Sequence, residues 1–182
     1  MLGIDPGVSR CGYGAVVGRG NDCRAVSFGV IRTPPDMPLP ERLGRLQGEL
    51  EALVEELSPS AVAVERVLFQ VNVRTAMSVG QASGLALATA ARAGIPVAQY
   101  SPNEVKLAVA GYGGAEKRAM QDMVVRLLGL AAPPGSPDAA DALALALCHL
   151  YGAKLYAARD TAREPAAGYA KAVAAALAKE AR

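Results

Sequence analysis

The sequence predicts a single α/β domain with a mixed five-stranded sheet flanked by helices. Three short β-branched runs, separated by turn residues, come first, and later apolar runs alternate with helical patterns. The chain has 182 residues, of which 52% are hydrophobic, enough to bury one substantial core. Strands that come first in succession and then alternate with helices indicate mixed strand directions.

The first third of the chain predicts an antiparallel meander followed by a helix. Its strands are expected at Leu2–Ile4, Gly12–Val17 and Ala25–Ile31, divided by Gly, Asn and Asp. Four prolines between residues 34 and 40 end the third strand. From Glu41 to Leu57, leucines recur at steps of three and four residues, which is typical of an amphipathic helix.

The rest of the chain predicts alternating strands and helices. Ala61–Val64 is continuously apolar, as in a strand buried on both faces, and Ile95–Tyr100 is the fifth strand. Helices are expected at Val73–Ala93, 102–109, 115–129 and Pro137–Tyr151. We expect a domain of residues 1–152 and, at 153–182, a loosely attached Ala-, Lys- and Arg-rich tail, helical or disordered.

Several function classes are disfavoured by composition. The three cysteines show no C-x-x-C pairing, which argues against a disulfide framework or a zinc–thiolate site. The one histidine, His149, lies in an apolar stretch and does not favour Ser-His or Cys-His catalysis. With no signal-peptide pattern and no apolar run of membrane-spanning length, the protein is expected to be soluble and cytoplasmic.

Charge is distributed unevenly along the chain. Residues 1–65 carry six basic and nine acidic side chains, a balance of −3, whereas residues 66–126 carry seven basic and three acidic ones, a balance of +4. An electropositive middle is compatible with a polyanion bound over one face, although it is too weak to indicate nucleic acid by itself.

Two carboxylates follow apolar strands directly. Asp5 ends the first strand, and Glu65 follows the four apolar residues of the fourth. Asp-Pro-Gly is also common turn chemistry, and a carboxylate at a strand end can simply be solvated. Because ligand sites of open α/β sheets gather at the carboxyl ends of strands, the repeated arrangement favours a shared site.

Two further acids lie three residues apart on the last core helix. Asp138 and Asp141 share a face of this otherwise apolar helix, so that face should point toward the sheet. Ser136 and Pro137 are typical of an N-cap and first turn, where the helix dipole alone would explain Asp138. The dipole explains Asp141 less well.

Four converging carboxylates would repel one another without cations. Oxygen-only ligands select hard ions such as Mg²⁺ or Mn²⁺. Two such ions in one site could stabilise the attacking and leaving oxygens of a phosphodiester displacement, with no histidine base.

Five stretches of the chain resemble the bacterial RuvC Holliday-junction resolvases. These are residues 2–7 (LGIDPG), 63–67 (AVERV), 80–84 (GQASG), 113–117 (GGAEK) and 138–144 (DAADALA), and their order and spacing also fit. The resemblance covers roughly residues 1–152. It implies a ribonuclease-H-like fold and a homodimer that cuts two opposed strands of a four-way DNA junction symmetrically, in recombination and repair, with the RuvA–RuvB branch-migration complex as partner.

The resemblance also suggests site residues. Asp5, Glu65, Asp138 and Asp141 resemble the family's metal ligands, and Lys106 and Lys117 match lysines near the scissile phosphate. Candidate DNA contacts are Arg66, Phe69, Arg74, Lys106, Lys117 and Arg118. In the family an aromatic side chain at about position 69 stacks on junction bases, and here that place falls on either Leu68 or Phe69. Gly80 and Gly84 fall in the region of the family's dimer contact, or else pack against the sheet.

Two other functions remain open. The hairpin from Asp5 to Gly12 also resembles the first phosphate-binding loop of actin-like ATPases and sugar kinases, although those enzymes need a second lobe that 182 residues cannot supply. A junction-binding module that lost its chemistry is the other alternative, and the presence of all four acids argues against it.

Overall fold

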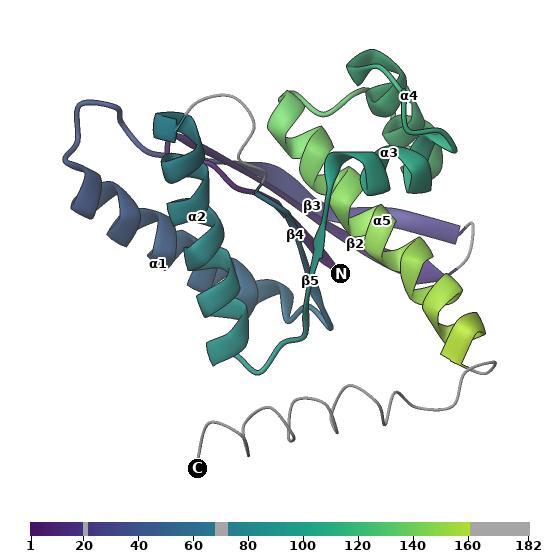
Figure 1. Ribbon diagram of the computed structural model, residues 1–182, viewed down its shortest axis with the longest axis horizontal. Helices are drawn as coiled ribbons and strands as arrows, with labels where there is room; N and C mark the ends of the chain where they lie inside the picture. Colours follow the sequence, from purple (N-terminus) through teal and green to yellow (C-terminus); the bar gives the residue numbers. More distant parts are fainter. Residues whose placement is uncertain (20–21, 68–72, 161–182) are drawn as a thin grey trace, which may run out of the picture. The chain divides into compact units, whose positions relative to one another are not determined.

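Five strands form one mixed sheet in the order β3-β2-β1-β4-β5 (Figure 1). The computed structural model describes residues 1–19, 22–67 and 73–160. The strands are β1 (Leu2–Asp5), β2 (Arg10–Arg19), β3 (Asp22–Arg32), β4 (Val62–Glu65) and β5 (Val97–Tyr100). β1, β2 and β3 pair antiparallel, whereas β4 pairs parallel with both β1 and β5. The predicted meander and mixed sheet are confirmed, and β1 is central.

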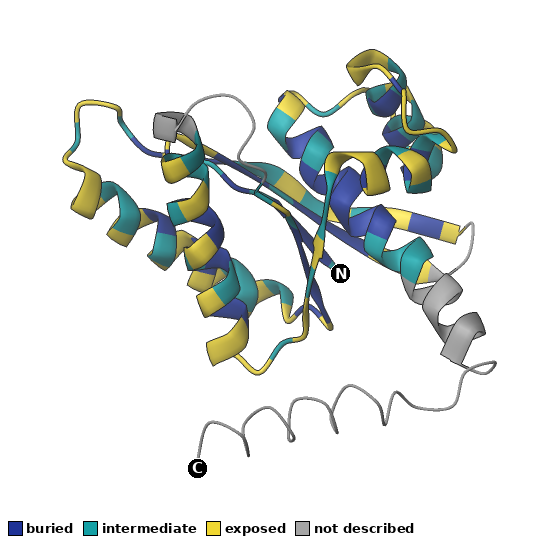
Figure 2. Ribbon diagram, viewed as in Figure 1, coloured by how far each residue is buried: buried dark blue, intermediate teal, exposed yellow. Residues whose placement is uncertain are grey.

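Helices cover both faces of this sheet (Figure 1). They are α1 (Leu39–Leu57), α2 (Val73–Arg92), α3 (Pro102–Ala110), α4 (Lys117–Leu128) and α5 (Pro137–Asp160). On one face, α1 and α2 pack against Leu2, Ile4 and Val64. On the other, α3, α4 and α5 pack against Val16 and Ala63. Figure 2 colours the ribbon by burial, and the buried residues of these helices lie mainly along the parts that face the sheet.

The α5 helix lies unusually close to the first two strands. A Cβ atom added at Gly3 would lie 2.0 Å from the carbonyl oxygen of Ala142, and one at Gly12 would lie 2.1 Å from that of Asp138. These distances are far inside van der Waals contact, so the strand positions tolerate only glycine. The helix therefore rests on strand backbone, which fixes its first turns relative to β1 and β2.

Most predicted elements are found within two residues of their expected ends, but β3 begins at Asp22, before the predicted Ala25. Helix α5 continues to Asp160, past the predicted Tyr151, because Gly152 is followed by the helix formers Ala-Lys-Leu. Gly80 and Gly84 are exposed, and a Cβ added at either would meet nothing within 4 Å. Of the two possibilities for these glycines, packing against the sheet is therefore contradicted, and a place at a dimer contact stays a prediction.

Residues Met1–Tyr151 form one compact unit by their contacts, and Gly152–Arg182 form a second. The domain boundary after residue 152 and the nature of the tail stay predictions. No helix in the described part of the chain is long and apolar enough to cross a membrane.

Candidate active site

Asp5 and Glu65 lie at the carboxyl ends of two adjacent parallel strands. Ile4 of β1 is in register with Val64 of β4, so the acids that follow them are also neighbours. Alternation along each strand places both acids on the face that α5 covers, because Ile4 and Val64 belong to the opposite core. The sequence pattern therefore brings two carboxylates together at one edge of the sheet.

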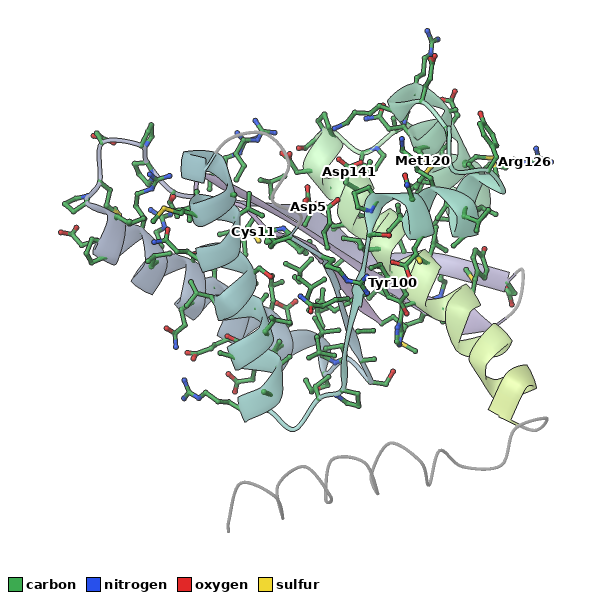
Figure 3. The ribbon with its side chains drawn as sticks, in the orientation of Figure 1. Asp5, Cys11, Tyr100, Met120, Arg126 and Asp141 are labelled. Atoms are coloured by element: carbon green, nitrogen blue, oxygen red, sulfur yellow. The ribbon has the colours of Figure 1, made fainter. Side chains whose placement is uncertain are left out.

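The first turns of α5 bring two more carboxylates to the same edge. Ser136 acts as the predicted cap: its side chain accepts a hydrogen bond from the backbone N–H of Asp138 at 3.3 Å. Asp138 lies in the first turn, and Asp141 follows one turn later. Figure 3 shows Asp141 near Asp5, at the end of α5 that contacts Gly12.

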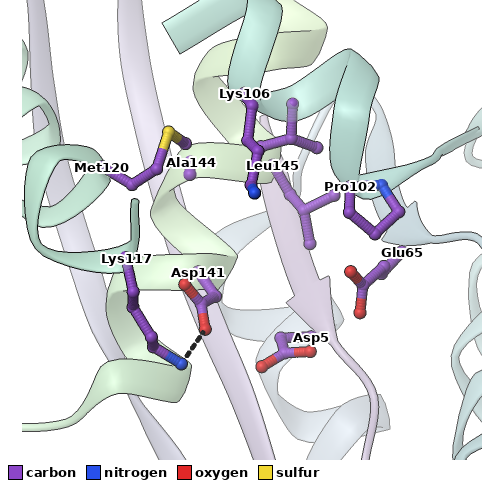
Figure 4. A pocket seen from close by; sticks show the side chains of 10 residues that line it. Asp5, Glu65, Pro102, Lys106, Lys117, Met120, Asp141, Ala144 and Leu145 are labelled. Atoms are coloured by element: carbon purple, nitrogen blue, oxygen red, sulfur yellow. Dashed lines mark hydrogen bonds and ion pairs between the residues drawn. The ribbon is translucent and has the colours of Figure 1, made fainter. Parts of the chain in front are cut away.

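A cavity of about 290 Å³ opens between these strand ends and α3, α4 and α5 (Figure 4). Acidic and basic side chains share its wall with apolar ones. The lining residues are Asp5, Glu65, Pro102, Val105, Lys106, Lys117, Met120, Asp141, Ala144 and Leu145. Three of the four predicted ligands thus line one cavity, together with both predicted lysines, whereas Asp138 is not among the described residues that line it.

Burial and mutual repulsion perturb the acids of the cavity. Burial raises the pKa of Asp5 to about 7, and the negative charges of Glu65, Asp141 and Asp138 add to this effect, against the opposing charge of Lys117. Burial likewise raises the pKa of Glu65, with Asp141 contributing. Carboxylates that resist ionisation in this way are stabilised by a cation.

Lys117 provides one such cation. Its Nζ donates to Oδ2 of Asp141 at 3.1 Å, and this hydrogen bond raises the pKa of Lys117. The side chain is still 62% exposed, which leaves it accessible to a second anion. Lys106 reaches toward the cavity from α3, which a capping box between Ser101 and Glu104 anchors directly after β5 (Figure 4).

Asp138 has its own cation, which the sequence analysis missed. Arg10 of β2 donates from Nε to Oδ2 of Asp138 at 2.7 Å, and its Nη2 lies 2.6 Å from the same oxygen. Burial acts to raise the pKa of Asp138, but the hydrogen bonds from Arg10 and Ser136 outweigh it and lower that pKa. The signal in the sequence was the spacing of Arg10 and Gly12, which share one face of the strand.

Hydrogen bonds from Thr33 and Arg42 stabilise the turn between Asp5 and Arg10. The Thr33 hydroxyl donates to the carbonyl oxygen of Val8 at 2.6 Å, and Arg42 donates from Nε to the Thr33 hydroxyl at 2.9 Å. Arg42 also hydrogen-bonds Ser9. These contacts hold the backbone that connects Asp5 to Arg10.

Of the remaining predicted DNA contacts, Arg66 and Arg118 have described side chains, and neither lines the cavity. Arg66 donates to the carbonyl oxygen of Gln99 at 3.0 Å and lies 3.8 Å from a carboxylate oxygen of Glu104. Arg118 is exposed on α4. Both Leu68 and Phe69 lie outside the described residues, as does the side chain of Arg74 in the first turn of α2.

The acids at this edge suit a hard divalent ion by their chemistry. All four offer oxygen atoms, and burial leaves the charge of Asp5 and Glu65 poorly compensated. As the side chains stand, no three His, Cys, Asp or Glu within the described ranges are grouped closely enough to hold one ion. Two of the four acids are instead held in ion pairs, Asp138 with Arg10 and Asp141 with Lys117.

Comparison with known proteins points to one family. A model of the family described as "Crossover junction endodeoxyribonuclease RuvC" matches residues 1–149. A protein of that name from Salinispora arenicola is 54% identical over 168 residues, covering 90% of this chain and 96% of the relative. Another from Chloroflexus aggregans is 55% identical over 152 residues, covering 84% and 93%.

Solved structures agree with the sequence relatives. The Thermus thermophilus RuvC in complex with a Holliday junction substrate superimposes with a TM-score of 0.81 at 39% identity, covering 85% of this chain and 94% of that one. The yeast mitochondrial Holliday junction resolvase, at 16% identity and a TM-score of 0.60, supports the ribonuclease-H-like fold alone.

Proposed function

Because the chain belongs to the RuvC family of crossover junction endodeoxyribonucleases, we propose that it cuts Holliday junctions at the cavity between the strand ends and α5. The chain is a nuclease, a hydrolase of phosphodiester bonds that acts in DNA recombination and repair. The observation that carries the proposed site is the convergence of Asp5, Glu65 and Asp141 with two lysines in one cavity.

Asp5, Glu65, Asp138 and Asp141 would hold the divalent ions that this family of nucleases uses. Two Mg²⁺ or Mn²⁺ ions would supply Lewis-acid activation of water and of the phosphate oxygens. The raised pKa of Asp5 supports this assignment, since a buried carboxylate among other carboxylates gains most from a bound cation.

Lys106 and Lys117 offset the repulsion between the acids of the cavity and the phosphates of DNA. A phosphate that approaches three carboxylates is repelled, whereas ammonium groups beside them can hold it and stabilise charge that develops during reaction. Lys117 is positioned by Asp141, and Lys106 lines the same cavity. Val105, Met120 and Leu145 give the cavity an apolar wall, which strengthens these interactions by limiting water.

Symmetric cleavage of a junction requires two active sites, and α2 offers a surface for a homodimer. Met77 is 60% exposed, and the small residues Gly80, Gly84 and Ala88 continue its exposed stripe at steps of three and four. Small residues on one helix face allow a second helix to approach closely. A two-fold dimer through α2 would match the two-fold symmetry of the junction.

Three parts of the proposal rest on family resemblance or sequence pattern. These are the partnership with the RuvA–RuvB complex, the cytoplasmic location, and base stacking by Phe69. The alternative of an actin-like ATPase is set aside, because relatives that the chain matches over nearly their whole length are nucleases.

The test is cleavage of a labelled synthetic four-way junction and of a matched linear duplex, with Mg²⁺, Mn²⁺ or EDTA. Asp5→Asn is the inactive variant, and Asp122→Asn, an exposed acid on α4, is the matched control. We expect paired nicks in the junction alone, dependent on metal and lost only in Asp5→Asn. Junction binding without cleavage would instead support the non-catalytic module.

A further inference from the structure

Arg10 forms an ion pair with Asp138, one of the four acids proposed to hold the divalent ions. Arg10 places Nε and Nη2 within 2.7 and 2.6 Å of Oδ2 of Asp138. The Ser136 hydroxyl lies 3.0 Å from the same oxygen and 3.0 Å from Nη2 of Arg10. The three side chains form a closed set of polar contacts centred on Oδ2.

The fold imposes this pairing across a separation of 128 residues. Gly12 admits the carbonyl of Asp138 against β2, and Arg10 lies two residues earlier on the same strand face. A Cβ at Gly7 would come within 2.3 Å of the carbonyl oxygen of Arg10, so the turn before it is also tightly folded. Backbone contacts on both sides thus direct Arg10 toward the first turn of α5.

The Arg10 pair sets Asp138 apart from the three acids that share the cavity. Asp138 is absent from the described lining of the cavity that Asp5, Glu65 and Asp141 surround. Its charge is already balanced by a guanidinium, and a divalent ion placed beside it would meet that positive charge.

Building on the proposed function, we propose that Arg10 is an internal counter-ion that competes with divalent ions for Asp138. Arg10 thereby raises the metal concentration that the nuclease needs. Arg10 is a positioning residue, because its proposed effect on metal binding is exerted through Asp138. Lys117 holds Asp141 in a comparable way but lines the cavity itself, so its removal would alter substrate binding as well.

The size of the effect follows from the exposure of the pair. The side chains of Arg10 and Asp138 are 46% and 26% exposed, so solvent screens much of their attraction. Half-exposed ion pairs contribute modestly, and we expect loss of the Arg10 charge to tighten metal binding roughly two- to fivefold. The Ser136 hydroxyl would still orient Oδ2 of Asp138.

The experiment is a titration of Mn²⁺ alone into the metal-free full-length protein, with free Mn²⁺ measured by electron paramagnetic resonance. Arg10→Gln removes the charge and keeps a hydrogen-bonding group, while Arg10→Lys retains the charge. Arg92→Gln is the matched control, because Arg92 pairs with Glu51 at 3.1 Å on α1 and α2. The same Arg10→Gln change is repeated in an Asp138→Asn background.

We expect tighter Mn²⁺ binding in Arg10→Gln, near wild-type binding in Arg10→Lys and Arg92→Gln, and no effect of Arg10→Gln once Asp138 is replaced. Cleavage of the junction should reach half its maximum at a correspondingly lower metal concentration. Unchanged or weaker Mn²⁺ binding in Arg10→Gln would overturn the inference and leave the nuclease function standing. A wild-type protein that binds no Mn²⁺ would overturn the proposed metal site itself, and the inference with it.

Discussion

Replacement of Asp5 by asparagine should stabilise the metal-free protein while abolishing cleavage. Burial and the neighbouring acids raise the pKa of Asp5 from 3.8 to about 7. The folded state therefore keeps a proton that the unfolded chain has already released, and the free energy of unfolding falls as pH rises between these two values. A shift of this size corresponds to about 4 kcal/mol, at 1.36 kcal/mol per pKa unit.

Asparagine does not ionise, so the gain in unfolding free energy from Asp5→Asn should follow the titration of Asp5. The difference in unfolding free energy between Asp5→Asn and wild type should grow by about 1.4 kcal/mol per pH unit from about pH 4 to about pH 7 and stay constant above that. Saturating Mg²⁺ should reverse the order, because an ion that binds only the folded wild type stabilises it by mass action.

Urea unfolding in EDTA, followed by circular dichroism from pH 4.5 to pH 8.5, measures this difference directly. The matched control is Asp36→Asn, because Asp36 is exposed in the loop between β3 and α1. A difference that is the same at pH 5 and pH 8, or one that shrinks as pH rises, would refute the assignment of Asp5 to a buried cluster of acids.

Three further perturbations test other parts of the structure. Gly12→Ala should destabilise the protein by about 2–3 kcal/mol in thermal or urea unfolding, because the added methyl would overlap the carbonyl of Asp138, whereas Gly48→Ala on α1 meets nothing and should stabilise it by up to about 1 kcal/mol; equal effects would contradict the close packing of α5. Lys117→Met should lower the cleavage rate about 100-fold and weaken junction binding only a fewfold, measured by single-turnover kinetics and gel shift, and equal losses in both would argue that Lys117 serves binding alone. Gly84→Arg should convert the proposed dimer to monomers in sedimentation equilibrium without loss of thermal stability, since its Cβ meets nothing within the chain, and an unchanged mass would remove α2 from the interface.

Local sequence patterns predicted the two acids at the strand ends well. A short apolar run followed by a carboxylate specifies both the strand and the point where it ends, so Asp5 and Glu65 could be paired before the structure was known. Helical spacing likewise placed Asp138 and Asp141 on α5. These inferences need only the periodicity of one element at a time.

Contacts between distant elements were not predictable in the same way. The pairing of Arg10 with Asp138 depends on the depth to which α5 settles on the glycines of β1 and β2, which no local pattern encodes. Gly80 and Gly84 show the same difficulty, because in the sequence small residues at helical spacing are identical whether their helix face is buried or exposed. The proposed roles of Lys106 and Lys117 came from the resemblance to relatives, because spacing alone left both lysines as surface charges.

The contact between α5 and the strand glycines also limits how the site can move. A helix that rests on side chains can slide by small rotamer adjustments, but at Gly3 and Gly12 this helix meets backbone, which has no rotamers. Asp138 and Asp141 therefore lie on a helix that can move relative to the strands only as a rigid body. Lys106 and Lys117 lie on two other helices, α3 and α4, so the proposed site draws these two acids and its lysines from separate structural elements.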